Sequence, residues 1–160
     1  MTANPVAPLL VFGWGNLSRG DDALGPLFIE QVRAMWADDR GVECQEDYQL
    51  QIEHALDLVA RQRVLFADAS LTCQAPFEVT PLQAVHDASF TTHAMSPQAL
   101  LQVYQQLRGE APPPCTLLAI RGESFELGEP PSAEALHNLA AALTWAHTWL
   151  DEPQTLVAHA

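Results

Sequence analysis

The chain has 160 residues, the size of one globular domain with a sizeable hydrophobic core. Acidic residues outnumber basic ones by 20 to 7, every basic residue is an arginine, and the net charge is -13. This charge repels phosphate backbones and anionic lipid surfaces, so it argues against nucleic acids and membranes as partners.

The sequence shows no targeting segment and no disulfide framework. Its N-terminal stretch has neither the basic nor the apolar region of a signal peptide, and no window reaches the ~20 apolar residues that span a bilayer. The three cysteines are isolated and odd in number, which suits a reducing compartment. We expect a cytoplasmic monomer with a single domain over residues 1–160 and frayed ends at 1–7 and 153–160.

The first half of the chain alternates strand patterns with helical patterns. Strands are predicted at residues 8–15, 41–48 and 63–70. Between them, helices are predicted at residues 23–36 and 52–61. Asp22 stands where the N-cap of the first helix belongs, and Glu53 and His54 are expected on the solvent side of the second.

The second half continues this alternation. Residues 76–83 carry prolines typical of an edge strand, and residues 115–122 predict a last buried strand. Helices are expected after Ser96-Pro97, with Leu107 facing inward, and after Ser132, with Leu136 in the apolar stripe. The fold class is therefore α/β: a twisted, mostly parallel five-stranded sheet with helices on both faces, in which an edge strand can run antiparallel.

Polar residues gather at one edge of this predicted sheet. Right-handed crossovers place the first strand between the second and third, and ligands of such sheets bind at the carboxyl ends of the strands. Asp22 and Asp68 each follow an apolar strand, and His93 lies in a polar loop before a helix. Together these oxygen and nitrogen ligands suit a borderline divalent metal ion with open coordination positions.

Each of these residues also has a purely structural interpretation, and both interpretations remain open at this point. Asp22 can cap a helix, Asp68 can form a turn at a strand end, and His93 can be an ordinary surface histidine.

Other kinds of site fit the sequence less well. Ser18, His93 and Asp68 could be drawn as a catalytic triad, but no Gly-x-Ser-x-Gly motif surrounds the serine. Cys73 has no neighbour that would activate its thiol. A flavin or nucleotide site would need phosphate-binding groups after the first strand, where "NLSRGDD" instead offers carboxylates.

Three motifs in order resemble the [NiFe]-hydrogenase maturation endopeptidases. "VFGWGNLSRGDDALG" is similar to their opening strand, Gly-x-Gly-Asn turn and acidic pair, "VLFADAS" to their third-strand motif, and "TTHAMSPQALLQV" to their histidine loop and following helix. "DYQLQIEHALDL" and "ESFELGEPPSAEALHNL" further resemble the subgroup that serves NAD-linked cytoplasmic hydrogenases. Many members have Asp-Gly-Gly-Thr after the second strand, where this chain has "EDYQLQ", so the role of Asp47 is left open.

The resemblance implies a function and a site. The family removes a C-terminal extension from the precursor of the hydrogenase large subunit after nickel insertion, and the nickel is contributed by the substrate. Carried over by position, Asp22, Asp68 and His93 are the metal-contacting and catalytic residues, and other divalent ions can substitute for nickel. The alternative is a non-catalytic nickel chaperone or docking protein that uses the same residues on the same subunit.

Overall fold

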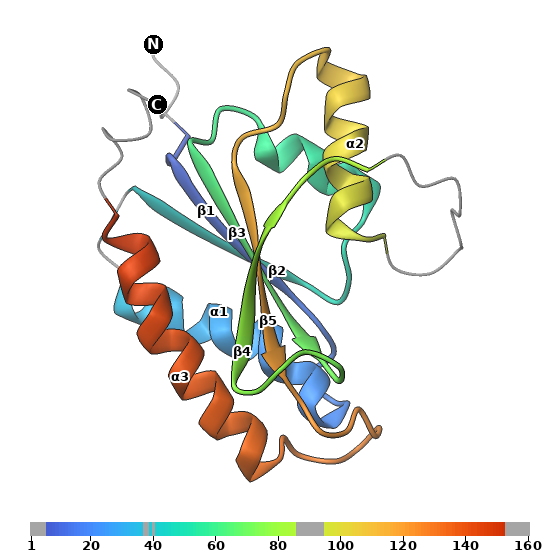
Figure 1. The fold of residues 1–160 in the computed structure, drawn as a ribbon, viewed down its shortest axis with the longest axis vertical. Helices are drawn as coiled ribbons and strands as arrows, with labels where there is room; N and C mark the ends of the chain where they lie inside the picture. Colours follow the sequence, from blue (N-terminus) through green and yellow to red (C-terminus); the bar gives the residue numbers. More distant parts are fainter. Residues whose placement is uncertain (1–5, 37–38, 40, 86–94, 153–160) are drawn as a thin grey trace.

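The computed structural model describes residues 6–36, 39, 41–85 and 95–152. These residues form a five-stranded sheet with helices around it (Figure 1). The strand order of the sheet is β2-β1-β3-β5-β4. The strands are β1 (Leu9–Trp14), β2 (Val42–Asp47), β3 (Arg63–Ser70), β4 (Phe77–Leu82) and β5 (Cys115–Arg121). All neighbouring strands pair in parallel except β4 and β5, which pair antiparallel. The predicted fold class is confirmed, and its antiparallel member is the edge strand β4.

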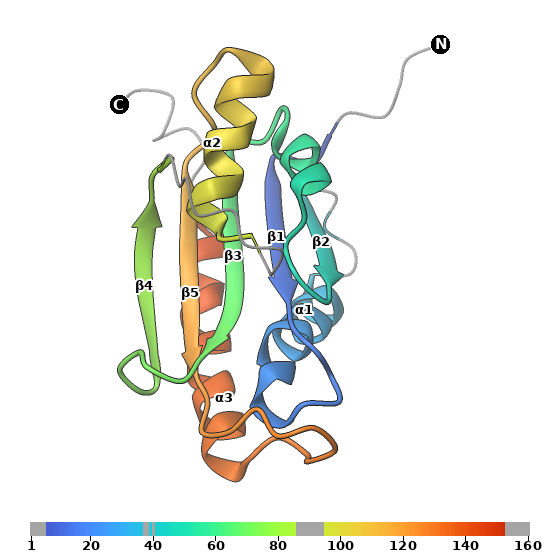
Figure 2. The same ribbon diagram turned by 90° about the vertical axis from the view of Figure 1, so that its right-hand side faces the viewer.

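Helices cover both faces of the sheet. The helical elements are η1 (Gly20–Ala23), α1 (Leu24–Met35), η2 (Ile52–Leu58), α2 (Pro97–Arg108) and α3 (Ala133–Leu150), where η denotes a 3-10 helix. Helices α1 and α3 pack on one face, and η2 and α2 pack on the other (Figure 2). No helix in the described part of the chain has both the length and the apolar character needed to cross a bilayer.

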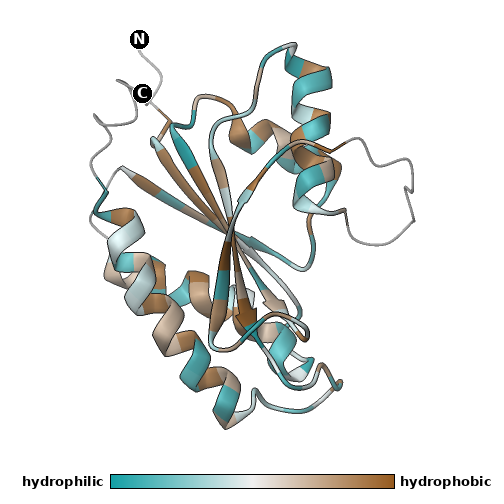
Figure 3. Ribbon diagram, in the orientation of Figure 1, coloured by the Kyte–Doolittle hydropathy of each residue, from teal (hydrophilic) through white to brown (hydrophobic). Residues whose placement is uncertain are grey.

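The central strands are apolar throughout because both of their faces are covered. In β1, Leu9 and Val11 join the core beneath α1 and α3, whereas Leu10 and Phe12 join the core beneath η2 and α2. Side chains alternate between the two faces of a strand, so a strand between two layers has no polar side. Figure 3 shows this contrast, with brown strands inside and much of α2 in teal.

Three predictions about the helices were wrong, and a fourth, which concerns His54, is described with the site. The helix expected at 52–61 is the shorter 3-10 helix η2, in which Ala55 and Leu58 are buried and Leu56 is exposed. Residues three apart share one face of a 3-10 helix, so Ala55 and Leu58 can both face the core. Leu107 is exposed because it lies in the last turn of α2, beyond the buried residues of that helix. Leu136 is exposed because α3 turns Ala135 and Leu139 toward the core instead.

The capping role that was open for Asp22 is contradicted, because Asp22 does not cap α1. The N-cap of α1 is Ala23, whose side chain makes no capping hydrogen bond. The 3-10 turn η1 runs directly into α1 and already contains Asp22, so its carboxylate is free to make a different contact.

Candidate functional site

Glycines allow the loop after β1 to fold back tightly over the end of the strand. Gly15 has a φ of 148°, and a Cβ atom placed there would lie 2.0 Å from the carbonyl oxygen of Asp22. A Cβ atom on Gly25 would lie 2.2 Å from the carbonyl oxygen of Trp14. No side chain fits at either position, so Gly15 and Gly25 together allow Asp22 to lie at the carboxyl end of β1.

The Asp22 carboxylate is held at this strand end by the backbone of the loop. Its Oδ2 accepts a hydrogen bond from the backbone N–H of Asn16 at 2.9 Å. The side chain of Asn16 in turn accepts from the backbone N–H of Ser18 at 2.8 Å. Asp22 is half-buried, so its remaining lone pairs are available to a ligand at this edge of the sheet.

The adjacent Asp21 points into the protein and has a structural role. It is 1% exposed, and its carboxylate accepts hydrogen bonds from the backbone N–H groups of Glu123, Ser124 and Ser132 and from the Ser132 hydroxyl. Burial raises the pKa of Asp21, but these hydrogen bonds outweigh it and hold the pKa below its ordinary value. Two adjacent aspartates are therefore tolerated because one ties down the loop before α3 while the other faces the strand ends.

Asp68 lies at the carboxyl end of the neighbouring strand β3, close enough to Asp22 to feel its charge. Burial, and then the negative charge of Asp22, raise the pKa of Asp68 to about 7. Hydrogen bonds from the Ala69 backbone and the Trp14 side chain act in the opposite direction. Near neutral pH, Asp68 therefore exists in both protonation states, which is the property required of a general acid or base.

The structure brings Asp22 and Asp68 together and does not describe His93. The loop that contains His93 lies outside the described residues. Among the residues that are described, no three His, Cys, Asp or Glu side chains form a group that could hold a metal ion. The three-residue ligand set therefore stays a prediction.

A hollow opens beside the acidic edge. It has a volume of about 290 Å³ and is lined by Gly15, Leu17, Pro26, Glu46, Asp47 and Tyr48. We refer to it as the Asp47 hollow. Gly15 belongs both to the wall of this hollow and to the turn that carries Asp22, so the hollow adjoins that turn.

Sequence reasoning missed His54, which was expected to face solvent. The exposed fraction of its side chain is only 11%, and its Nε2 lies 3.1 Å from Oδ2 of Asp47. The ring of His54 also packs edge-on against Phe12, with ring centroids 4.6 Å apart. No sequence pattern reveals this contact, because it depends on how η2 packs against β1 and β2.

Solved structures show which known proteins share this fold, although no protein-family model and no curated protein sequence matches the chain. The maturation protease HycI of Thermococcus kodakarensis KOD1 aligns with a TM-score of 0.66 and 19% identity over 91% of this chain and 94% of that chain. The maturating endopeptidase HybD of Escherichia coli aligns with a TM-score of 0.67 and 24% identity over 89% of this chain and 91% of that chain. The hydrogenase 2 maturation peptidase of Thaumarchaeota archaeon SCGC_AB-539-E09 aligns with a TM-score of 0.64 and 22% identity over 89% of this chain and 97% of that chain.

The fold is that of the hydrogenase maturation proteases. The likeness spans nearly the whole length of both chains in each comparison, so the sheet and the helices on both its faces are shared. In this maturation-protease fold, Asp22 and Asp68 occupy the edge where parallel sheets bind their ligands.

The three cysteines of this chain are poor candidates for a nucleophile at neutral pH. Burial raises the pKa of Cys44 to about 11 and that of Cys115 to about 12. Burial also raises the pKa of Cys73, whose Sγ donates a hydrogen bond to the carbonyl of Ala119. A thiol is reactive only as the thiolate, so the paired carboxylates are the stronger candidates for chemistry.

Proposed function

We propose that this protein is an endopeptidase that removes the C-terminal extension of a [NiFe]-hydrogenase large subunit after nickel insertion. The observation that carries the proposal is the pairing of Asp22 and Asp68 at the carboxyl ends of β1 and β3, with the pKa of Asp68 raised to about 7. The maturation-protease fold and the three ordered sequence motifs support the same function.

The metal in this proposal is cargo of the substrate. Thiolates of the hydrogenase subunit hold the nickel, since soft ligands suit it, and Asp22, Asp68 and His93 contact it from one side. Such a site recognises a loaded precursor, and other divalent ions can substitute for nickel in binding studies.

Hydrolysis then needs only water and a base. Asp22 or Asp68 takes a proton from a water molecule while the oxygen of that water attacks the scissile carbonyl carbon. The carbon–nitrogen bond breaks, and the leaving amine accepts the proton. The nickel acts either as a recognition element alone or also as a Lewis acid on the carbonyl.

The proposal extends to the client and its compartment. The stretch at residues 47–58 resembles the subgroup that serves NAD-linked hydrogenases, so we place the protein in the cytoplasm, acting as a monomer on the precursor of such a subunit. Its net charge of -13 suits a precursor surface that carries basic residues.

The decisive experiment incubates purified protein with nickel-loaded precursor and follows the mass of the precursor. We expect loss of a C-terminal peptide with the wild type and with His137→Ala, a control at an exposed histidine of α3. His93→Ala should bind the precursor but leave its mass unchanged while its own fold is retained.

Two results would contradict the endopeptidase. Full processing of the precursor by His93→Ala would contradict the proposed role of His93 in the site. Binding of the loaded precursor by the wild type without any mass loss would instead identify a nickel chaperone or docking protein.

A further inference from the structure

The Asp47 hollow combines acidic groups with exposed apolar surface. Among its described lining residues, the two that carry a charge, Asp47 and Glu46, are both acidic. Oε1 of Glu46 also forms an ion pair with Nη1 of Arg33 at 3.6 Å. Leu17 and Tyr48 stand at its rim with exposed fractions of 58% and 73%. These two side chains therefore offer apolar surface to a ligand that enters the hollow.

The carboxylate of Asp47 is held in place on both sides. Its Oδ1 accepts the backbone N–H of Tyr48 at 2.7 Å, and its Oδ2 lies 3.1 Å from Nε2 of His54. The other ring nitrogen of His54, Nδ1, accepts the backbone N–H of Gln51 at 2.8 Å. Because Nδ1 acts as an acceptor, the ring proton lies on Nε2, which donates to Asp47.

We propose that the Asp47 hollow is a subsite for a positively charged side chain of the substrate peptide, and that His54 is the positioning residue that orients Asp47 toward it. This inference rests on the proposed function, because the hollow adjoins the turn that carries Asp22. An arginine or lysine fits the walls: its charge meets Asp47, its aliphatic stem covers Leu17, and the ring of Tyr48 offers a cation–π contact.

This arrangement belongs to residues 47–58, which depart from the Asp-Gly-Gly-Thr pattern of many family members and resemble one subgroup. Where many members have two glycines after the aspartate, this chain has Tyr48 and Gln49 and continues into η2, which carries His54. A glycine turn cannot orient the aspartate through a side chain. In this protein His54 of η2 orients the aspartate, and the ring of Phe12 packs edge-on against His54.

Two short peptides test the inference without any cleavage. One is acetyl-Ala-Leu-Arg-Leu-Ala-amide, and the other carries citrulline, which has the shape of arginine without its charge. Binding is followed by NMR shifts of the Glu46 and Tyr48 amides. We expect the arginine peptide to bind about fivefold more tightly than the citrulline peptide at low salt, and Asp47→Asn to abolish the difference.

Variants of His54 separate positioning from a general structural role. His54→Phe keeps the ring contact with Phe12 but removes both the Nε2 donor to Asp47 and the Nδ1 acceptor of the Gln51 N–H, so it should weaken discrimination between the peptides. When combined with Asp47→Asn, His54→Phe should cause no further loss of discrimination between the two peptides. His54→Gln retains a side-chain N–H donor and should restore part of the discrimination, which also serves if the phenylalanine variant does not fold.

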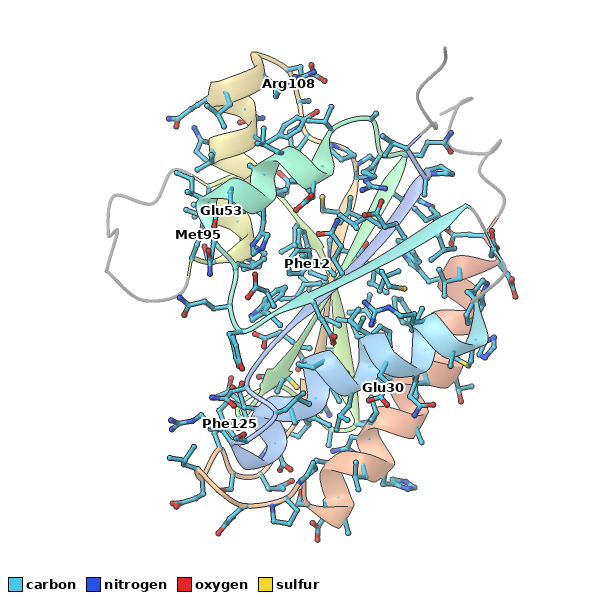
Figure 4. The ribbon with its side chains drawn as sticks, turned by 180° about the vertical axis from the view of Figure 1, so that it is seen from behind. Phe12, Glu30, Glu53, Met95, Arg108 and Phe125 are labelled. Carbon is cyan, nitrogen blue, oxygen red and sulfur yellow. The ribbon has the colours of Figure 1, made fainter. Side chains whose placement is uncertain are left out.

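A matched control removes a charge beside the pair without touching it. Glu53 is exposed on η2, labelled in Figure 4, and does not line the hollow, so Glu53→Gln should discriminate as the wild type does. Equal binding of both peptides to the wild type would overturn the inference, as would an equal loss in Glu53→Gln and Asp47→Asn. If the wild type also cleaves the nickel-loaded precursor, either result leaves the proposed endopeptidase function standing.

Discussion

Replacing Asp68 with asparagine should stabilise the metal-free protein at neutral and higher pH. In the wild type, burial and the charge of Asp22 raise the pKa of Asp68 from 3.8 to about 7. The folded state therefore holds a proton on Asp68 over a range of pH in which the unfolded chain has released it. The contribution of Asp68 to the stability of the wild type consequently falls as the pH rises from about 4 to about 7 and then levels off.

The size of the effect follows from the two pKa values. The full difference between 3.8 and about 7 corresponds to about 4 kcal/mol above pH 7, at 1.36 kcal/mol for each pH unit. Asp68 is half-buried, so part of this penalty is relieved by solvent, and we expect about 2 to 4 kcal/mol. Asparagine has the shape of the aspartate and can still accept a hydrogen bond, so little else should change.

The assay is urea unfolding of the wild type and of Asp68→Asn at several pH values between 4 and 8.5, in the presence of a chelator. The stability difference should be small at the acidic end, grow through pH 5 and 6, and reach a plateau above pH 7. Glu53→Gln, at an exposed carboxylate of η2, is the control and should show no such growth. A difference that stays constant with pH, or a less stable asparagine variant at pH 8, would refute the reasoning.

Three further changes probe the same edge of the sheet. Asp22→Asn should lower the pKa of Asp68 only in part, since burial is the larger cause; carbon NMR of the carboxyl group measures this, and an unchanged pKa would contradict the pairing. Gly25→Ala should cost about 2 kcal/mol or more in urea unfolding, because its Cβ would meet the carbonyl oxygen of Trp14 at 2.2 Å; wild-type stability would refute the tight turn. Asp21→Ala should cost about 3 kcal/mol at neutral pH, because it leaves buried N–H donors unpaired. Since the pKa of Asp21 is lowered, this loss should shrink as the pH falls below about 4, and a loss independent of pH would count against the carboxylate.

The order of the elements and the shape of the sheet were predictable from the sequence. Apolar runs at β1, β3 and β5 require cover on both faces, and the intervening helical patterns supply that cover. The edge position of β4 followed from its prolines, since an edge strand does not need every N–H for pairing. The same local logic placed Asp22 and Asp68 at one edge, because parallel strands end on the same side of the sheet.

The roles of individual polar side chains were decided by the tertiary structure. Asp21 and Asp22 are indistinguishable in a sequence pattern, yet the partners of Asp21 lie more than 100 residues further along the chain. The helical pattern at residues 52–61 predicts a solvent-exposed His54, whereas packing against Phe12 and Asp47 encloses it. The raised pKa of Asp68 arises in the same way, because burial and a neighbouring charge exist only once β3 lies beside η1. Local pattern determines which segments form strands and helices, but the charge state and the contacts of a side chain depend on groups that only the folded chain brings near it.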